Sequence, residues 1–507
     1  MEWTAEADVV IVGGGGAGLA AAVAAASEGA RVIVLEKAAA CGGTTALAIG
    51  SMTVAGSSMQ RQAGIEDSPA AHDEDIAKFA PHLEGRNTPE LRRAFLEQAA
   101  ETFEWLRELG VPFRGPSPEP PNRVPRMHNA IPDARHGYIR VLHDAARRLG
   151  ASLRLGRRAG RLLRSEAGDV VGVEADCADP EGHPRGERFA ARCGVILAAG
   201  DFSADPILKA THLQRFAHVE AINPNSTGDG HRLGMEAGAA ARNMDVLDGP
   251  QTRFVPRWSP LSGAGEPAAR AAAQETTPGH GDAKIDLEVN LGCAWLRPEP
   301  ALFEAGAILV NRAGERFGNE LKHPDIEVAM ARQPGKVAFV LFDAKLVEQF
   351  SRWPHCVCTA PNIAYAFVED LRRHRPDFTA QGPSLEMLAA RLGCPAEALV
   401  ATVAAYNDAV AGRAADRHGR QSFAAPLATP PFTSLGPAKG VIGTTKGGLL
   451  VNTTMQVLRG DGRAIPGLYA AGNNGMGGIY FAGHGLAIAW AMTSGRIAGR
   501  QAALRRT

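Results

Sequence analysis

Three glycines near the start of the chain have the spacing of a dinucleotide site. Gly13, Gly15 and Gly18 form a G-x-G-x-x-G pattern within the run GGGGAG. In this pattern the first glycine permits a tight turn, the second lets the backbone approach a pyrophosphate, and the third lets a helix pack on a strand. Glu36 follows and can accept hydrogen bonds from both ribose hydroxyls while repelling a 2′-phosphate. These residues predict a bound dinucleotide with free ribose hydroxyls.

The neighbouring stretches supply the elements that must hold these residues. Val9–Val12 and Arg31–Leu35 are short apolar runs suited to buried parallel strands, and Leu19–Ser27 is an alanine-rich helix candidate. The N-terminus of such a helix offers free N–H groups and a partial positive charge to phosphates. A membrane span over Val9–Ala26 and an ordinary glycine turn are the alternatives. Five glycines, a marginal length and flanking acidic residues disfavour the span.

A second glycine-rich loop follows Lys37. Cys41–Ser51 reads CGGTTALAIGS, so two glycines precede hydroxyl side chains. Backbone N–H and hydroxyl donors of this kind suit an anion, and we predict contact with the second phosphate and the edge of a flavin ring. A plain turn between elements is the alternative, because such clusters are common in loops.

Composition limits the classes of protein that fit. At 507 residues the chain predicts two or three domains. Lys+Arg and Asp+Glu are both 54, so charge gives no case for a nucleic-acid partner. Seven scattered cysteines indicate reduced thiols and a cytoplasmic protein, and the acidic start MEWTAEAD gives no expectation of export. Cys356 and Cys358 form an isolated pair, for which ordinary loop cysteines are favoured over a metal site.

Periodicity and breakers predict the remaining elements. Helices are expected at Asn87–Gly110, Tyr138–Leu149, Thr227–Ala240, Ser384–Leu392, Pro395–Val410 and Gly485–Arg500. Strands are expected at Ser152–Leu155, Val170–Ala175, Arg188–Arg192, Gly194–Ala199, Gly306–Asn311, Val337–Phe342, Gly448–Val451 and Gly467–Ala471. Residues 249–300 predict long loops, and Pro426–Pro437 predicts a proline-rich return segment.

The change of composition near residue 248 predicts an inserted domain. We expect residues 1–247 and 433–507 to form one α/β, Rossmann-like domain, and residues 248–432 to form an α+β capping domain inserted into it. No second strand–GxGxxG–helix unit occurs, so a separate nicotinamide domain is not expected. Cys41 also lacks a nearby redox partner, which predicts direct electron transfer between flavin and a substrate or an external carrier.

A series of motifs extends over nearly the whole chain: GGGGAGLAAA, Glu36-Lys37, CGGTTALAIGS, NTPELRRAFLE with WLRELGV, TGDGHRLG, GAILVNRAGERFGNE, and IPGLYAAGN followed by GLAIAWAMTSGRIAG. Their order resembles an FAD-dependent family that contains soluble fumarate reductases, flavoprotein subunits of succinate dehydrogenase and 3-ketosteroid dehydrogenases. The resemblance implies a discontinuous FAD domain with a smaller capping domain, and substrate held between them against the flavin ring.

The resemblance also implies which residues contact FAD. They are Gly13, Gly15, Gly16, Ala17, Gly18, Glu36, Lys37, Gly42, Gly43, Thr44, Thr45, Ala48, Gly50, Ser51, Ala159, Ala199, Gly200, Asp229, Gly472, Asn473, Gly485, Leu486, Ala487 and Ile488. Succinate dehydrogenases attach flavin through a histidine in the loop that here reads Gly43–Leu47, so non-covalent FAD is expected.

Two departures favour the ketosteroid dehydrogenase side of the family. Fumarate reductases carry a proton-donating arginine shortly after an R-F-x-N-E motif, and Pro324 stands at that position here. Their histidine before a Gly-Gly pair is also absent from the stretch GTTKGG at residues 443–448. Both losses count against a dicarboxylate substrate.

The resemblance to ketosteroid dehydrogenases implies a set of catalytic groups. Tyr480 and the Gly485 N–H would bind a substrate ketone, His323 would remove the α proton, and His484 would have a polar role near the flavin. A register shift of one would put Phe481 in the place of Tyr480. Stabilising the carbonyl oxygen is what makes the α proton acidic, and a histidine has a suitable pKa for removing it. His323 as a surface histidine and Tyr480 as a core tyrosine are the alternatives.

The main hypothesis is therefore an FAD-dependent dehydrogenase that introduces a C=C bond beside the carbonyl of a cyclic, steroid-like ketone. Its expected partners are a small hydrophobic ketone and an external electron acceptor. The runner-up is an ene-reductase of an unsaturated acid, with Arg126, Arg253 or Arg257 as carboxylate anchors. Arg126 and His128 would line the pocket mouth, and a basic surface loop is the alternative for them. A non-catalytic flavin-binding redox sensor is the alternative of another class.

Overall fold

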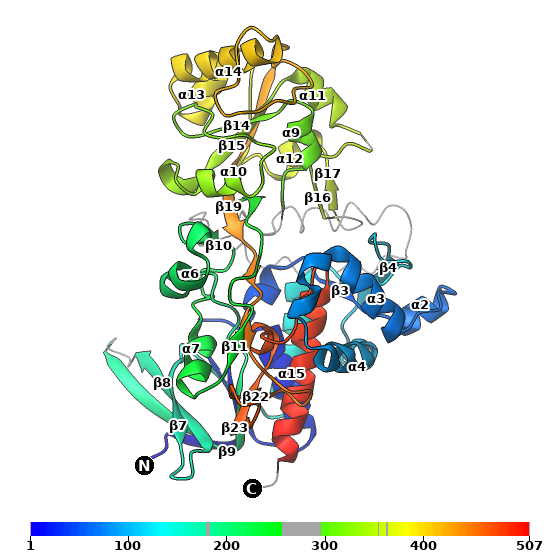
Figure 1. Ribbon diagram of the computed structural model, residues 1–507, viewed down its shortest axis with the longest axis vertical. Coiled ribbons are helices and arrows are strands. Elements are labelled where there is room, and N and C mark those ends of the chain that lie inside the picture. The colour runs from blue at the N-terminus through cyan, green and yellow to red at the C-terminus, as the bar shows by residue number, and fades with distance from the viewer. Residues whose placement is uncertain (1, 179–182, 256–295, 353, 361–363, 506–507) are drawn as a thin grey trace. The chain divides into compact units, whose positions relative to one another are not determined.

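The computed structural model describes residues 2–178, 183–255, 296–352, 354–360 and 364–505 (Figure 1). The chain divides into two compact units. The first unit contains Met1–Gln214, Asn223–Asp248 and Thr444–Thr507, and the second contains Arg215–Ile222 and Gly249–Gly443. The second unit is thus inserted into the first.

A mixed eight-stranded sheet lies at the centre of the first unit. Five of its strands are parallel, in the order β23-β9-β1-β2-β6. The eight strands are β1 (Ala5–Val12), β2 (Val32–Glu36), β6 (Ser152–Leu155), β7 (Arg158–Arg164), β8 (Val170–Ala178), β9 (Pro184–Leu197), β22 (Gln456–Leu458) and β23 (Ala464–Ala470). The Rossmann-like α/β expectation is confirmed, although β9 is one continuous strand where two were predicted.

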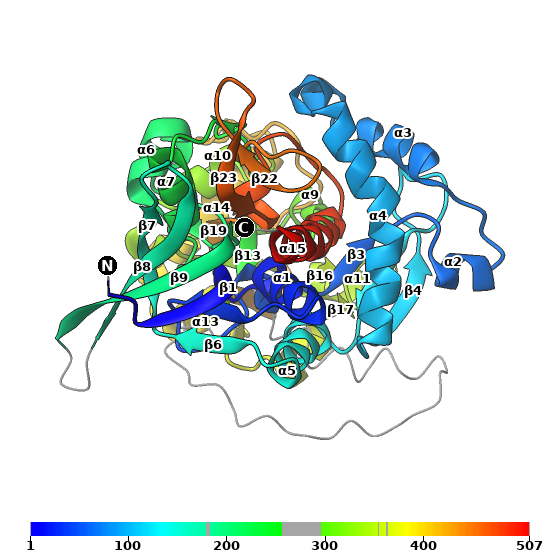
Figure 2. The same cartoon turned by 90° about the horizontal axis from the view of Figure 1, so that it is seen from below.

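Helices α1 (Gly16–Ser27) and α15 (Leu486–Leu504) lie side by side against this sheet (Figure 2). The close approach depends on glycines in α15. A Cβ on Gly495 would lie 2.3 Å from the backbone oxygen of Ala17, and one on Gly499 would lie 2.2 Å from that of Ala21. Small residues on both helices therefore bring the last helix of the chain onto the first.

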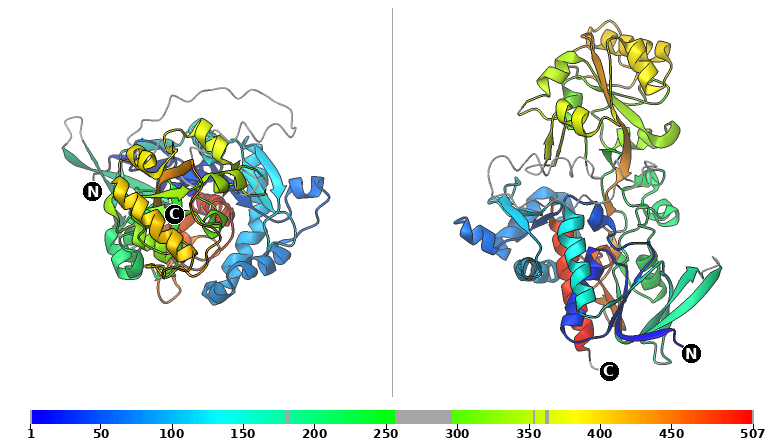
Figure 3. Two further views of the ribbon diagram at one scale, coloured as in Figure 1. Left: turned by 90° about the horizontal axis from the view of Figure 1, so that it is seen from above. Right: turned by 180° about the vertical axis from the view of Figure 1, so that it is seen from behind.

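The other elements of the first unit surround this core. Helix α5 packs along α1, and β7, β8 and the start of β9 form an antiparallel extension of the sheet (Figure 3). The helices are α2 (Ser58–Gln62), α3 (Pro69–Phe79), α4 (Pro89–Glu108), α5 (Arg140–Arg148), α6 (Pro206–His212) and α7 (Asp229–Glu236). Small sheets are formed by β3 (Ser51–Thr53), β4 (Phe113–Ser117) and β5 (Met127–Ala130), by β11 (Ala241–Arg242) with β21 (Gly448–Leu449), and by β12 (Leu247–Asp248) with β20 (Thr444–Thr445).

The second unit is built on a six-stranded sheet with its own apolar core. Its strands are β10 (Glu220–Ala221), β13 (Gln251–Phe254), β14 (Ile308–Val310), β15 (Ala338–Phe342), β18 (Thr379–Gly382) and β19 (Phe432–Ile442), and a hairpin adds β16 (Cys358–Ala360) and β17 (Ala364–Ala366). Its helices are α9 (Pro300–Glu304), α10 (Asp325–Met330), α11 (Ala344–Gln349), α12 (Val368–His374), α13 (Leu385–Leu392) and α14 (Ala396–Val410).

Strand β19 differs from the expected return segment and moves the second boundary. It pairs with β10, β13, β15 and β18, so the chain leaves the second unit after Gly443, not after residue 432 as expected. The misleading residues are Gly436 and Pro437, which lie inside the strand where its register with β15 shifts. The loops expected over residues 249–300 fall mostly on 256–295, outside the described residues, and 251–254 form β13 instead.

Within the described ranges, no helix combines the length and apolar character needed to cross a bilayer. The same ranges contain no group of three or more His, Cys, Asp or Glu residues arranged to hold a metal ion.

Candidate cofactor and substrate sites

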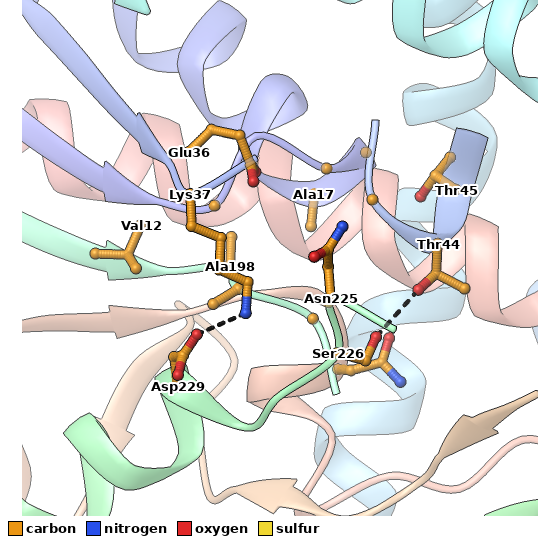
Figure 4. A pocket seen from close by; sticks show the side chains of 18 of the residues that line it. Val12, Ala17, Glu36, Lys37, Thr44, Thr45, Ala198, Asn225, Ser226 and Asp229 are labelled. Carbon is orange, nitrogen blue, oxygen red and sulfur yellow. Dashed lines mark hydrogen bonds and ion pairs between the residues drawn. The ribbon is translucent and has the colours of Figure 1, made fainter. Parts of the chain in front are cut away.

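A cavity of the first unit opens where its parallel strands end (Figure 4). Its empty volume, which includes space open to solvent, is about 780 Å³. Ligands bind at this edge of α/β sheets because the strands end there together. The lining residues are Val12, Gly13, Gly15, Gly16, Ala17, Leu35, Glu36, Lys37, Gly43, Thr44, Thr45, Arg157, Arg158, Ala159, Ala198, Ala199, Gly200, Asn223, Asn225, Ser226, Asp229, Ala471, Gly472, Asn473 and Ala491.

The start of α1 provides a place for a phosphate. Gly15 caps the helix, and the first helical bond runs from the Leu19 N–H to the Gly15 oxygen at 2.9 Å. The N–H groups of the three residues between them therefore precede the helical ladder. A Cβ added to Gly15 would have no neighbour nearer than 3.9 Å, so it would project into the cavity. The backbone is open where a pyrophosphate must approach.

Glu36 lies at the end of β2 and lines the same cavity. One of its carboxylate oxygens accepts the Gly14 N–H at 2.7 Å, and the other accepts the Ala38 N–H at 2.8 Å. Each oxygen retains a lone pair, because a carboxylate has about four acceptor positions. Glu36 is thus held rigidly and can still accept hydrogen bonds from ribose hydroxyls.

Asp229 pairs with Lys37 at the cavity wall (Figure 4), and it also binds Arg158 and Arg232. Its carboxylate accepts Lys37 Nζ at 2.7 Å and Arg158 Nη2 at 2.7 Å. Burial acts to raise the pKa of Asp229, but the hydrogen bonds from Arg158 and Lys37 outweigh it and leave the pKa below its usual value. An ionised Asp229 therefore orients Lys37 and Arg158 beside the space for a phosphate-bearing ligand.

Some of the expected cofactor residues lie outside this lining. Gly42 and Gly18 support the turn: the Gly42 N–H binds the Gly14 oxygen at 2.9 Å, and a Cβ on Gly18 would lie 1.9 Å from the Gly13 oxygen. Gly50 accepts the Tyr138 hydroxyl, and Ser51 donates to Asn129, so both are tied into the small sheet. Ala48 caps a short 3-10 turn, and Gly485, Leu486, Ala487 and Ile488 begin α15.

The cavity also contains residues that the motifs did not indicate, chiefly Arg157, Arg158, Asn223, Asn225 and Ser226. The arginines could have been found from topology. They follow β6, which is parallel to β2, so they emerge at the same edge of the sheet as Glu36. The three polar residues precede the TGDG motif, and nothing in their own types or spacing distinguishes them.

The start of α15 is fixed by contacts with earlier segments of the first unit. Gly485 caps this helix in a left-handed conformation with φ of 76°, and a Cβ there would lie 2.6 Å from Thr53 Oγ1. Thr53 Oγ1 donates to the His484 backbone oxygen at 2.7 Å. Glu119 accepts both the backbone N–H of His484 at 2.8 Å and its Nδ1 at 2.6 Å. His484 therefore anchors the turn before the helix.

Tyr480 and Phe481 have opposite surroundings. Phe481 is buried and packs on Phe95 with ring centroids 4.9 Å apart, so it belongs to the core. Tyr480 is half-buried, and its backbone N–H donates to Asn87. Burial raises the pKa of the Tyr480 hydroxyl, and the charge of Asp248 adds to this. Tyr480 is consequently a neutral hydrogen-bond donor at ordinary pH, whereas Phe481 has no polar group to offer.

His323 lies in the second unit beside a buried carboxylate. Its Nδ1 lies 2.7 Å from Glu327 Oε1, and the side chain of Glu327 is 1% exposed while that of His323 is 46% exposed. Thr252 Oγ1 donates to the same Glu327 oxygen at 3.0 Å. The hydrogen bond to Glu327 raises the pKa of His323, and this outweighs the opposing effect of burial. Because Nδ1 of His323 contacts Glu327, Nε2 is the ring nitrogen that can exchange a proton with another molecule.

The arginines considered as carboxylate anchors have different surroundings. Arg126 is wholly buried and binds Asp67 at 2.6 Å and Asp75 at 2.5 Å, so the expectation that it lines a pocket mouth is wrong. His128 is also wholly buried and bonds Ser57. Arg253 donates to Gln251 on β13, and Arg257 lies outside the described residues.

Replacing Arg126 by Met is expected to destabilise the fold by about 3–5 kcal/mol, because the buried carboxylate of Asp67 loses the guanidinium paired with it, whereas Asp75 keeps Lys78 and Arg123. Hydrogen bonds from Arg126 oppose the effect of burial on Asp67 and keep its pKa below the usual value. This stabilisation is present above about pH 4 and is lost as the pH falls further. Urea unfolding of the parent and the variant at neutral and acidic pH measures it. Equal stabilities at neutral pH would contradict the assignment.

Comparisons with known proteins agree with this architecture. A family profile described as the FAD binding domain matches residues 8–485. "Fumarate reductase (cytochrome)" of Shewanella frigidimarina is 28% identical over 475 residues, covering 91% of this chain and 71% of the relative. "4-oxocyclohexanecarboxylate 2-dehydrogenase" of Sinomonas cyclohexanicum is 29% identical over 396 residues, covering 71% and 59%. The structure of the open conformation of a flavocytochrome c3 fumarate reductase is 26% identical with a TM-score of 0.75, covering 99% and 78%.

The profile covers most of the chain, and the cavity supplies a helix N-terminus, an open glycine backbone, the Glu36 carboxylate and flanking cations. These residues fit FAD. The chain belongs to the FAD binding domain family and is an FAD-dependent oxidoreductase similar to fumarate reductases.

Proposed function

We propose that this chain acts on the carbon–carbon bond beside the carbonyl group of a cyclic, steroid-like ketone. Tyr480 and the first N–H groups of α15 bind the carbonyl oxygen, and His323 exchanges the α proton. FAD, bound without a covalent link, supplies the site that accepts or donates the hydride. The observation that carries the proposal is the half-buried, neutral Tyr480 hydroxyl close in sequence to the N-terminus of a 19-residue helix.

These groups stabilise the same developing charge. A carbonyl oxygen becomes enolate-like as its α proton leaves, and preorganised donors lower the cost of that charge. Tyr480 offers an O–H that stays protonated, and the start of α15 offers N–H groups and the positive end of a helix dipole. Contacts from Asn87, Thr53 and Glu119 hold the segment, so the donors need little reorganisation.

A cyclic ketone is favoured as the substrate class for two reasons. The relative from Sinomonas cyclohexanicum is named as a dehydrogenase of a cyclic oxo acid. In addition, Arg126, one of the candidate carboxylate anchors, is already neutralised by Asp67 and Asp75. A carbonyl needs hydrogen-bond donors more than a fixed cation.

Reduction of an unsaturated carboxylic acid is the second candidate. It is favoured by the similarity to the fumarate reductase of Shewanella frigidimarina. In that reaction Arg253 and Arg257 remain as candidate anchors. The proton exchanged at His323 is the same in both candidates.

Steady-state assays separate the two candidates. Saturated ketosteroids and cyclohexanone are tested with an electron-accepting dye, and cyclohexenone and fumarate are tested with a reduced viologen dye. We expect turnover of a cyclic ketone. Activity on fumarate with none on any cyclic ketone would overturn the proposal.

Replacing Tyr480 by Phe is expected to lower kcat/KM for the ketone about 10²–10³-fold, as typically follows the loss of one oxyanion donor. FAD content should be unchanged, because Tyr480 does not line the cavity that fits FAD. Tyr406→Phe is the matched control: its hydroxyl bonds the Ala425 backbone in the second unit. Equal losses in the two variants would remove Tyr480 from the carbonyl site.

Acid precipitation of the purified, yellow chain is expected to leave the flavin in the supernatant. No histidine occurs in the loop Gly43–Leu47, through which related dehydrogenases attach flavin. The visible spectra of pellet and supernatant measure the partition. Yellow colour that stays with the pellet would show a covalent bond.

A further inference from the structure

Glu327 is a buried acid whose contacts couple it to His323. It is 0% exposed and comes from α10, while Thr252, its other hydrogen-bond donor, comes from β13. Both donors meet the same oxygen, Oε1. The other oxygen, Oε2, is buried and has no hydrogen-bond partner within the described residues.

A carboxylate in this position needs a counter-charge. Transferring an ionised carboxyl group out of water is costly unless it is paired and hydrogen-bonded. Thr252 donates one neutral hydrogen bond, so a neutral His323 would leave the charge of Glu327 without a cation in direct contact. A protonated His323 supplies that cation at 2.7 Å.

Other charged groups lie near His323 in the structure or the sequence. Arg297, from the segment before α9, acts against its protonation. Lys322 and Asp325 are close in sequence; they pair with each other at 3.2 Å, and Asp325 also pairs with Arg215. Glu327 is the charged group in hydrogen-bond contact with the ring, and its effect exceeds that of Arg297.

We propose that Glu327 positions His323 and holds a proton on it, so that at neutral pH His323 is a proton donor and the chain is a reductase of conjugated cyclic ketones. This rests on the proposed function and gives its direction. His323 donates its Nδ1–H to Glu327, so Nε2 is the ring nitrogen that is left to exchange a proton with the substrate.

The β carbon receives a hydride equivalent, two electrons and one proton, from the reduced cofactor. The electron pair of the resulting enolate forms a C–H bond at the α carbon while the Nε2–H bond of His323 breaks. Neutral His323 then takes a proton from solvent, and no proton is transferred to or from Glu327. Desaturation needs the neutral imidazole as the base, so its rate is expected to rise as the pH increases.

Histidine NMR of the FAD-loaded chain tests the coupling without any substrate. The His323 resonance is identified by its absence in His323→Gln. We expect a pKa above the ordinary value of about 6.5 in the parent, and Glu327→Gln should lower it by about 1–3. Asp325→Asn is the matched control, because it removes a neighbouring carboxylate that does not touch the ring, and should move the pKa much less. Glu327→Asp should restore part of the rise.

The activity arm uses a reduced viologen dye with cyclohexenone. The pH at which reduction falls to half should shift downward in Glu327→Gln together with the His323 pKa. An unchanged His323 titration in Glu327→Gln would overturn the inference. A His323 pKa at or below about 6.5 in the parent would also overturn it, and that measurement does not depend on the folding of any variant. A shifted titration without a shifted activity profile would overturn the proton-donor role. Full activity in His323→Gln would instead overturn the proposed function of His323 and leave the coupling to Glu327 standing.

Discussion

Replacing His323 by Gln is expected to lower turnover of a cyclic ketone about 10²–10⁴-fold, the usual contribution of a general acid or base. The reason is geometric: His323 is held by Glu327 at 2.7 Å and keeps 46% of its side chain exposed. Glutamine fills a similar volume but cannot exchange a proton at neutral pH. Steady-state kinetics in both reaction directions measures the loss.

The flavin content of the same variant separates chemistry from assembly. The cavity that fits FAD is lined by first-unit residues only, so His323→Gln should bind FAD as the parent does. His418→Gln provides a matched control in the second unit, where that histidine contacts Arg417. Parental kcat in His323→Gln on ketones and on fumarate would remove His323 from the reaction altogether.

Replacing Gly18 by Ala is expected to abolish FAD binding and to destabilise the chain by several kcal/mol. The new Cβ would lie 1.9 Å from the Gly13 backbone oxygen, and that contact cannot be relieved by rotating a side chain. The turn between β1 and α1 would have to open, and overpacking in a dense interior typically costs about 1–3 kcal/mol or more. Loss of the visible flavin spectrum and a lower midpoint of thermal unfolding measure the two effects.

Gly85→Ala is the control for this substitution. Gly85 has no neighbour within 4 Å of an added Cβ, and its backbone is not in the left-handed region. It should keep its flavin and its parental unfolding midpoint. If Gly18→Ala behaved like Gly85→Ala, the close packing of α1 against β1 would not be a requirement of the site.

The cofactor end of the fold could be predicted from sequence because its constraints are local. A strand, a tight turn and a helix occur within Ala5–Ser27, and the closest approach at Gly18 is to the Gly13 oxygen inside that stretch. Strand β19 could not be predicted in the same way. Gly436 and Pro437 have the local properties of a turn, and only pairing with β13, β15 and β18 makes the segment a strand.

In the candidate site, too, features that depend on contacts with distant segments could not be predicted from the sequence. Tyr480 and Phe481 are adjacent and both aromatic, and the sequence cannot decide which one faces the core; packing on Phe95 and Trp490 decides it. Arg126 looked like an exposed anchor because its partners, Asp67 and Asp75, are more than fifty residues away along the chain. Glu327 gave no sign of its role because its burial depends on β13 and β19.

The most direct test of the central claim is the return of visible flavin absorbance after anaerobic mixing. The chain is first reduced with dithionite and then mixed, in separate experiments, with cyclohexenone, an unsaturated ketosteroid, or fumarate. We predict that the yellow colour returns with an unsaturated cyclic ketone and not with fumarate. Reoxidation by fumarate alone would contradict the account.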